Sequence, residues 1–200
     1  MSRPVNTPSL LKPAVPRGSV PSDTELVARC RRGDHGAWRM LHDRHAPTVY
    51  RFLSALGVPA EEREDACQDV FVAVYRSLDR FRGAARLSTW IYRIAARGAG
   101  RAMRRRRMQG LLSTLLMREP TPPPDPDPSE RSARLATLDS MLQRLSPKKR
   151  LVLVLFEIEE LPVDEIARIA GCPENTVWSR LHHARSELTA MARKSAARGT

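Results

Sequence analysis

The chain has 200 residues, of which 42% are hydrophobic and only 5% aromatic. This composition favours small helical bundles with aliphatic cores and argues against an aromatic-rich sandwich or barrel. Thirty arginines and four lysines against 22 acidic residues give a formal net charge of +12. A polyanion is therefore the first partner to expect, because arginine makes forked contacts with phosphate, although a GC-rich genome would also favour arginine codons.

The cysteines and the apolar runs bear on cellular location. Cys30, Cys67 and Cys172 are far apart and form no CxxC pair, which predicts neither a disulfide framework nor a thiolate zinc site. The longest apolar run, 151–156, is far shorter than the roughly 20 residues that span a bilayer. The amino-terminal residues also lack the apolar core of a signal peptide. We expect a cytoplasmic protein without membrane insertion, metal or other cofactor.

Two proline-rich stretches divide the chain. Residues 1–21 carry no periodic apolar pattern and are predicted to be a disordered extension. The stretch EPTPPPDPDPS at 119–129 is typical of an extended linker, because proline removes backbone donors and fixes φ. We therefore predict an all-α protein with two small helical bundles joined by a Pro-rich linker. The predicted boundaries are 22–108 for the first domain, 109–129 for the linker, 130–193 for the second domain and 194–200 for a tail.

The first domain begins with two helix signals. Ser22 and Glu25 form a capping box, which predicts a short helix over 23–32. Asp34 is a suitable cap for a second helix, and Gly57 is a suitable residue to end it.

A third and a fourth helix complete the first domain. The third begins after Pro59, and the fourth begins near Ser88 or Thr89. In both, apolar residues recur at steps of three and four, the stripe of a helix packed on its neighbours. The predicted inward positions are Cys67, Val70, Phe71, Val74 and Leu78 in the third helix and Ile91, Ile94, Ala95, Ala99, Ala102 and Met103 in the fourth.

The second domain begins with two further helices. Ser146 and Pro147 supply a cap and a first-turn proline for the second of them. The apolar run 151–156 has the content of a strand, but its place after this cap and before several glutamates indicates a helix. The inward stripe of the preceding helix is predicted to be Leu135, Leu138, Leu142 and Leu145.

The end of the chain carries a helix-turn-helix pattern. A short helix over 163–170 is followed by Gly171, which supplies a turn, and by a longer helix over 174–191. The outward face of the longer helix is polar and basic, as in a helix that reads the major groove of DNA. An ordinary antiparallel helix pair with a solvated face is the alternative. The outward residues are Thr176, Trp178, Ser179, Arg180, His182, His183 and Arg185.

A run of positive charge lies between residues 80 and 107, which contain ten arginines and no acidic residue. Like charges on one helix face repel each other, and a bound polyanion would relieve that repulsion. Phe81, Trp90 and Tyr92 lie in the same run, where they would either stack on unpaired bases or pack in the core. The arginines that share one face of the fourth helix are Arg93, Arg97, Arg101 and Arg104, with Arg105 beside them.

The third helix begins with acidic residues. The helix dipole accounts for the first of them, but Asp65, Gln68 and Asp69 lie further along the helix. An acidic face on a basic protein is a poor surface for DNA and is better explained as a docking face for a basic protein partner.

The sequence contains no catalytic constellation. His42 and His45 are three residues apart but have no third ligand of matching spacing, so we interpret them as surface or packed histidines. Walker, GxSxG and HExxH motifs are absent. An enzyme that acts on nucleic acid would need clustered carboxylates, and Asp125 and Asp127 lie in the linker. We therefore expect no enzymatic activity.

Four segments in this order resemble one family: DTELVARCRRGD (23–34), DACQDVFVAVYRSLDRFRG (65–83), STWIYRIA (88–95) and LSPKKRLVLVLFEIEELPVDEIARIAGCPENTVWSRLHHARSEL (145–188). The chain resembles the bacterial extracytoplasmic-function (ECF) sigma factors, the two-domain type of the sigma-70 family. The resemblance implies a dissociable subunit of RNA polymerase that binds the beta-prime clamp and the beta subunit of the core enzyme, binds promoter DNA, and is held inactive by an anti-sigma factor.

The resemblance also implies roles for individual residues. The minus-10 element would be held as a single strand, with one base flipped into the loop 83–88, and the outward residues of the helix-turn-helix would contact the minus-35 element. The residues implied to bind the core polymerase are Asp65, Gln68, Asp69, Phe71, Val72 and Tyr75. Those implied to bind the minus-10 element are Arg86, Ser88, Thr89, Trp90, Arg93, Arg97, Arg101, Arg104 and Arg105.

Some residues depart from the family pattern. Arg97 and Arg101 stand where many members have Asn and Asp, so contact with phosphate is better supported than an inherited base preference. Pro162 stands where Ser often caps the helix, and Trp178 stands where Lys or Arg is usual. The alternative function is a free-standing helix-turn-helix regulator whose first domain binds nucleic acid nonspecifically through its arginines.

Overall fold

The computed structural model of the chain describes residues 20–115 and 130–197. Every regular element in these residues is helical, which confirms the predicted all-α class. The elements are α1 (Asp23–Arg31), α2 (His35–Ala55), α3 (Ala60–Ser77), the short 3-10 helix η1 (Leu78–Arg80), α4 (Leu87–Leu115), α5 (Glu130–Arg144), α6 (Pro147–Glu157), α7 (Val163–Ala170) and α8 (Glu174–Ala196).

The first two helices begin at the predicted caps. The Ser22 hydroxyl accepts a hydrogen bond from the Glu25 amide at 3.2 Å, and the Asp34 carboxylate accepts one from the Ala37 amide at 3.0 Å. The same two bonds remove backbone donors that helix ends otherwise leave unsatisfied. After α2, Gly57 turns the chain at a φ of 90°, a conformation that glycine adopts without steric cost.

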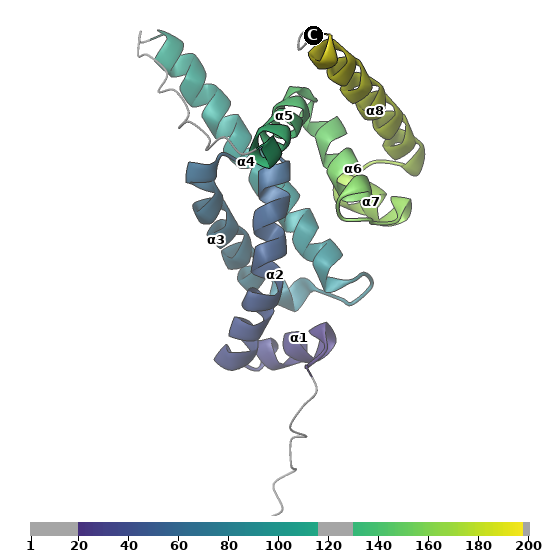
Figure 1. Ribbon diagram of the computed structural model, residues 1–200. Coiled ribbons are helices and arrows are strands. Elements are labelled where there is room, and N and C mark those ends of the chain that lie inside the picture. The colour runs from purple at the N-terminus through teal and green to yellow at the C-terminus, as the bar shows by residue number, and fades with distance from the viewer. Residues whose placement is uncertain (1–19, 116–129, 198–200) are drawn as a thin grey trace, which may run out of the picture.

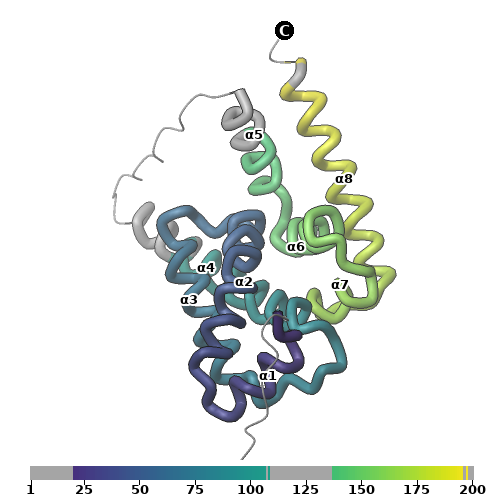
Figure 2. Tube along the Cα trace, turned by 60° about the horizontal axis from the view of Figure 1, so that its bottom comes forward, coloured from purple at the N-terminus to yellow at the C-terminus, as the bar shows by residue number. Residues whose placement is uncertain are grey.

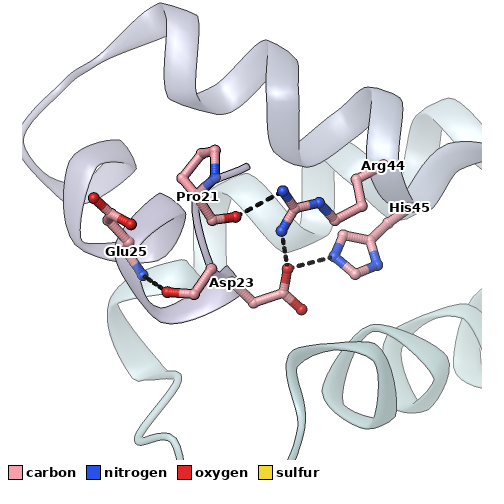
Figure 3. Close-up of polar contacts among 6 residues, drawn as sticks. Pro21, Asp23, Glu25, Arg44 and His45 are labelled. Carbon is pink, nitrogen blue, oxygen red and sulfur yellow. Dashed lines mark hydrogen bonds and ion pairs between the residues drawn. The ribbon is translucent and has the colours of Figure 1, made fainter. Parts of the chain in front are cut away.

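Helix α1 is tied to α2 by the polar contacts drawn in Figure 3. Arg44 donates to the Asp23 carboxylate and to the Pro21 carbonyl, each at 2.7 Å. The His45 Nε2 lies 3.4 Å from the same carboxylate. Burial lowers the pKa of His45, although Asp23 partly opposes this effect. The imidazole therefore favours its neutral form in the folded protein.

The apolar stripes of α2, α3 and α4 form the core of the first bundle. Leu41, Phe52, Val74 and Ile91 are almost completely removed from solvent. The ring of Phe52 also lies 4.7 Å from the ring of Tyr92, centroid to centroid. Burial of such side chains is the main favourable term in folding, so this core fixes α4 against α2 and α3. The predicted inward positions Cys67, Val70, Phe71, Leu78, Ala95, Ala99 and Ala102 are also buried.

The second bundle contains α5 to α8. Pro147 is the first residue of α6, as predicted, and the apolar run that follows is helical and buried from Val152 to Leu155. In α5, Leu142 and Leu145 are buried as expected, but the inward position predicted for Leu138 is wrong, because this side chain is 49% exposed. Periodicity predicts the apolar face of a helix but not which of its turns meet a neighbour.

The predicted domain boundaries are only partly covered by the described residues. Helix α4 continues to Leu115 and so overlaps the start of the predicted linker at 109–129. Residues 116–129 lie outside the described residues, as do residues 1–19 of the predicted extension and 198–200 of the predicted tail. The linker and the domain boundaries stay predictions.

The two bundles pack against each other. Helices α6, α7 and α8 lie on the right in both Figure 1 and Figure 2, and α3 lies on the left. The main contact joins α4 to α7. A second contact reaches α2, where the Arg150 side chain of α6 donates to the Leu56 carbonyl at 2.8 Å. Buried side chains of both bundles form one continuous apolar cluster.

Candidate nucleic-acid and protein interfaces

Helices α7 and α8 form the helix-turn-helix that the sequence predicts. Gly171 ends α7 with a left-handed φ of 62°, and the Cys172 amide then donates to the Ala167 carbonyl at 3.1 Å. Val177, Leu181 and Ala184 are buried inner residues of α8. The amino-terminal half of α8 is therefore held with its other face outward, which is the arrangement of a helix that reads the major groove.

On the outward face of α8, some side chains contact other residues of the protein and others are simply exposed. Arg185 is paired with Glu157 at 2.6 Å and lies over the Phe156 ring. Trp178 is 50% exposed and meets the same ring edge-on at 5.8 Å. Arg180 donates to the Cys172 sulfur at 3.3 Å. The other predicted residues of this face are Ser179, His182 and His183, which are exposed, and Thr176, which is half-buried.

The arginine row on α4 lies on the surface, as the charge argument requires. Arg93, Arg97 and Arg101 are all exposed, and none pairs with a carboxylate among the described residues. Arg104 and Arg105 are exposed as well, and Arg104 donates to the Gly100 carbonyl at 3.4 Å. Exposed guanidinium groups on one helix face are suited to binding a chain of phosphates.

A cavity of about 600 Å³ lies where α1 meets the loop that precedes α4. Arg31 of α1 holds the start of this loop, since its guanidinium donates to the Leu78 carbonyl at 2.9 Å and to the Phe81 carbonyl. The ring of Phe81 lies 5.5 Å from that of Trp90. The lining includes both Arg86, which is exposed, and Ser88, which is half-buried.

Thr89 and Tyr92 differ from the other predicted minus-10 residues and aromatic candidates because both are buried. The Thr89 hydroxyl donates to the Glu165 carboxylate of α7, and the Tyr92 hydroxyl donates to the Glu159 carboxylate that follows α6. In this arrangement neither side chain is open to a nucleic acid.

A groove of about 1240 Å³ lies between α2 and α3, and its lining includes Gln68, Phe71, Val72 and Tyr75 but neither Asp65 nor Asp69. Asp65, Gln68 and Asp69 are exposed. Their neighbours on this face, Val72 and Tyr75, are 41% and 60% exposed, which is unusual for large apolar side chains. The surface therefore joins carboxylates to an apolar patch.

Phe71 stands apart from the other predicted core-binding residues. It is only 4% exposed and packs on the His42 ring at 4.6 Å, so it supports the groove from below. Tyr75 also lines the groove, and its ring meets the Trp38 ring edge-on with 5.0 Å between the ring centroids. The exposed side chains of this surface are thus the polar residues of α3, together with Val72 and Tyr75.

The histidines singled out in the sequence have structural contacts. His42 lies 3.3 Å from the Asp43 carboxylate, and His45 belongs to the contacts that fasten α1. The described residues bring no three His, Cys, Asp or Glu side chains together around a possible metal. None of the helices described is both long and apolar enough to cross a membrane.

Sequence analysis missed Arg150 entirely. This guanidinium is 2% exposed and donates to the carbonyls of Leu56, Leu142, Gln143 and Leu145. Burial lowers the pKa of Arg150, and nearby Asp139 partly opposes this effect. A single arginine in a basic segment gives no periodic signal, and only the packing of two distant segments reveals its role.

Two family models match the chain. The model described as Sigma-70 region 2 matches residues 41–108, and the model described as Sigma-70, region 4 matches residues 135–188. The ECF RNA polymerase sigma-E factor of Escherichia coli is 32% identical over 181 residues, which cover 84% of this chain and 92% of that relative. The RNA polymerase sigma-H factor of Pseudomonas aeruginosa is 28% identical over 189 residues, which cover 83% and 91%.

Two solved structures share the fold. CnrH, solved in complex with the cytosolic domain of CnrY, has a TM-score of 0.66 at 24% identity and covers 84% of this chain and 96% of its own. The sigma factor RpoE of Bartonella quintana, solved with the anti-sigma factor NepR, has a TM-score of 0.66 at 22% identity, over 78% and 96%. Because the Escherichia coli relative matches across most of both chains at 32% identity, this chain belongs to the ECF sigma factors of the sigma-70 family.

Proposed function

We propose that this chain, as an ECF sigma factor in transcription initiation, binds core RNA polymerase and directs it to particular promoters. Its first bundle would help to open the minus-10 element, and its helix-turn-helix would read the minus-35 element. The proposal rests on two surfaces found together in one chain of the sigma family. Helix α4 carries a row of exposed arginines that pair with no carboxylate among the described residues, and α8 has an outward polar face. The chain would act through binding alone, without enzymatic activity.

The α3 surface is proposed to dock the core enzyme at the beta-prime clamp. Carboxylates at Asp65 and Asp69 suit a basic partner, while Val72 and Tyr75 supply the apolar area that stabilises protein interfaces. Gln68 lies between the two carboxylates in sequence and is also exposed. Phe71 would contribute by holding this surface in shape.

The α4 row is proposed to bind the separated minus-10 strand. Arg93, Arg97 and Arg101 would contact its phosphates, and Arg104 and Arg105 would extend the row along the helix. Phosphate contacts set position without selecting sequence, so the base preference must come from elsewhere.

The cavity beside α1 is proposed to take one flipped base of the minus-10 element. Extruding a base costs a few kcal/mol, which contacts in a pocket must offset. Arg86 and Ser88 offer polar groups at the wall, and the half-buried Trp90 lies next to them in sequence. Arg31 would act as a positioning residue, because it fixes the loop without needing to contact the base.

The α8 face is proposed to read the minus-35 element. Ser179, His182 and His183 are the exposed residues best placed for base edges. Arg180 and Arg185 have partners within the protein and suit contacts to the backbone, with Thr176 and Trp178 beside them. The beta subunit is the second polymerase partner that we expect for this bundle.

An anti-sigma factor is the proposed regulatory partner. The printed descriptions of two structural neighbours place CnrH with the cytosolic domain of CnrY and RpoE with the anti-sigma factor NepR. We propose the same class of partner for this chain. The chain would act in the cytoplasm, either free, with polymerase at the nucleoid, or held near the membrane by its inhibitor.

A mobility shift with and without core polymerase tests the proposed function. A sigma factor should shift promoter DNA specifically only when core polymerase is present. A free-standing regulator should instead bind duplex DNA tightly by itself, and it should lose roughly a thousandfold in affinity over a fourfold rise in salt if it contacts many phosphates. Specific binding without core, unaffected by its addition, would refute the proposal.

A further inference from the structure

The outward face of α8 begins with two uncharged side chains, those of Asn175 and Trp178. Asn175 is the second residue of the helix and is exposed, and Trp178 follows one turn later and is 50% exposed. Residues three apart lie on one face of a helix. The opposite face is the buried stripe of Val177, Leu181 and Ala184. The two side chains therefore lie on the outer surface at the end of the helix that reaches base edges in helix-turn-helix proteins.

The side-chain amide of Asn175 is available for binding. No hydrogen bond or ion pair takes up this amide in residues 20–115 and 130–197. Asparagine is common at the capping position of a helix, where its oxygen accepts a backbone N–H, but the residue that caps α8 is Pro173. Capping therefore does not explain Asn175, and its amide retains both a donor and an acceptor.

Trp178 is exposed but is supported from within the protein. Its ring meets the Phe156 ring edge-on, with 5.8 Å between the centroids. The Arg185 guanidinium lies over the same Phe156 ring at 5.2 Å and pairs with the Glu157 carboxylate at 2.6 Å. A large side chain that is held before binding loses little conformational entropy in a complex. The indole also carries no charge, so attraction to phosphate does not explain its place on this face.

The two side chains suit different groups of A·T base pairs. In the major groove, adenine presents the N7 acceptor beside the N6 donor, and one asparagine amide matches both. Thymine presents a C5-methyl group, which binds through apolar contact. Guanine and cytosine offer neither feature. Three residues advance about 4.5 Å along a helix, which is close to the roughly 3.4 Å between base pairs, so Asn175 and Trp178 can reach neighbouring base pairs.

We propose that Asn175 and Trp178 together select A·T base pairs in the minus-35 element. Asn175 donates to the N7 atom of an adenine and accepts from its N6 amino group, and Trp178 packs on the C5-methyl group of a thymine at a neighbouring base pair. The inference rests on the proposed function, since it places α8 in the major groove of that element. It adds Asn175 to the reading face and assigns the exposed ring of Trp178 to DNA and not to a second protein.

Base analogues test both contacts without a change in the protein. A preferred minus-35 sequence is first selected from a randomised duplex library with the full chain and core polymerase. In that sequence, deoxyuridine in place of thymine removes only the methyl group, and 7-deaza-adenine in place of adenine removes only the N7 acceptor. Competition binding should show a loss of about fourfold at one thymine, as for one buried methyl group, and of about fivefold at one adjacent adenine, as for one hydrogen bond.

Variants of the full chain assign each effect to one side chain. Trp178→Ala should bind deoxyuridine and thymine equally, whereas Trp178→Phe keeps a ring and should retain part of the difference. Asn175→Ala should bind 7-deaza-adenine and adenine equally, and its preference for adenine at that position should fall about tenfold. Ser186→Ala is the control and should keep both effects, because it is exposed on the same face about three turns beyond Asn175.

Three results would overturn the proposal. The first is a selected sequence without adenine and thymine at neighbouring base pairs, and the second is analogue effects that persist in the alanine variants. The third is a loss of affinity in Trp178→Ala with no analogue effect in the parent chain, which would assign the ring to a protein partner. Thermal melting by circular dichroism checks folding, and Trp178→Gln replaces Trp178→Ala if the alanine variant does not fold.

The same selection without core polymerase separates this inference from the proposed function. If the chain recruits core polymerase but the analogues change nothing, the inference alone is refuted. If the chain recruits no core polymerase to any promoter, the proposed function is refuted. Selection with the full chain alone, followed by the same analogues, then decides whether Asn175 and Trp178 read A·T pairs, and binding without any sequence preference would refute that reading as well.

Discussion

The turn between α2 and α3 depends on one residue, Gly57. Its φ of 90° places it in the left-handed region, and a side chain there would also meet Arg150 and Gln143. Gly33 is a matched position, since its φ is 82° but its Cβ would have no neighbour within 4 Å. A comparison of substitutions at the two glycines therefore separates the effect of backbone strain from the effect of the close contact with Arg150.

We predict that Gly57→Ala is more destabilising than Gly33→Ala. Backbone strain alone should reduce the free energy of unfolding by about 1 kcal/mol at either position. The clash with Arg150 should add about 1–3 kcal/mol at Gly57. Urea denaturation of the full chain measures both values. Equal losses would show that Arg150 moves aside freely and does not need this glycine.

The lowered pKa of His45 predicts how the stability of the folded protein changes with pH. Its pKa is lowered in the folded protein below the ordinary value of 6.5, so the unfolded chain takes up a proton at a higher pH than the folded one. The stability that neutral His45 contributes is therefore complete above about pH 6.5 and decreases as the pH falls towards the folded pKa.

Replacement of His45 should weaken that pH dependence. The urea midpoint of the parent chain should fall between about pH 7.5 and about pH 5.5, and His45→Gln should show a smaller fall. His35→Gln is the control, because His35 is exposed at the start of α2. The assignment to His45 is contradicted if both variants titrate alike.

At the scale of the helices, local signals in the sequence were reliable where a cap or a stripe was present. Ser22 and Asp34 cap helices and Pro147 begins one, as predicted, and the stripe of α3 is buried. The stripe of α5 failed at Leu138, because periodicity gives the apolar face of a helix but not how far its neighbours extend.

The α4 row should be needed for opening the promoter but not for binding the polymerase. Arg97→Ala with Arg101→Ala should reduce open complexes about tenfold or more and flatten the log–log salt slope by about 1.4, the value for two single-strand phosphate contacts. Permanganate footprinting and affinity for core polymerase measure the two steps. Arg32→Ala with Arg39→Ala removes the same charge from exposed positions of the first bundle. Similar losses in both variants would mean that only net charge matters.

The α8 face should determine the minus-35 preference. Ser179→Ala or His182→Ala should change discrimination by about 1 kcal/mol or more at one base pair, as expected when a contact to a base edge is lost. Ser186→Ala is the control for Ser179→Ala, because it lies two turns further along the same face and is also exposed. Selection from a library of randomised minus-35 sequences measures the preference. An unchanged preference would assign base contacts to other residues.

At the scale of the whole molecule, the sequence predicted the parts but not their arrangement. The two bundles, the arginine row and the helix-turn-helix follow from local patterns and from the family resemblance. The contacts of Thr89 with Glu165 and of Arg150 with Leu56 join residues far apart in sequence, and no periodic pattern encodes them. For this reason the sequence places Thr89 on a DNA surface, whereas in the structure its side chain is buried and donates to Glu165 of α7.

The arrangement also explains how one small chain can present three surfaces. The acidic α3 face, the α4 row and the α8 face lie on different helices, so under the proposed function polymerase and the two promoter elements would not compete for the same residues. Among the described residues, α7 of the helix-turn-helix contacts α4, which carries the arginine row, and Thr89 near the start of α4 donates to Glu165 of α7.

Run-off transcription with core polymerase on a library of randomised promoters tests the central claim most directly. We predict transcripts that depend on the added chain, that start at defined positions, and that select two separate sequence blocks upstream of the start. The account would be contradicted if the chain bound DNA but produced no chain-dependent transcripts with an active core polymerase.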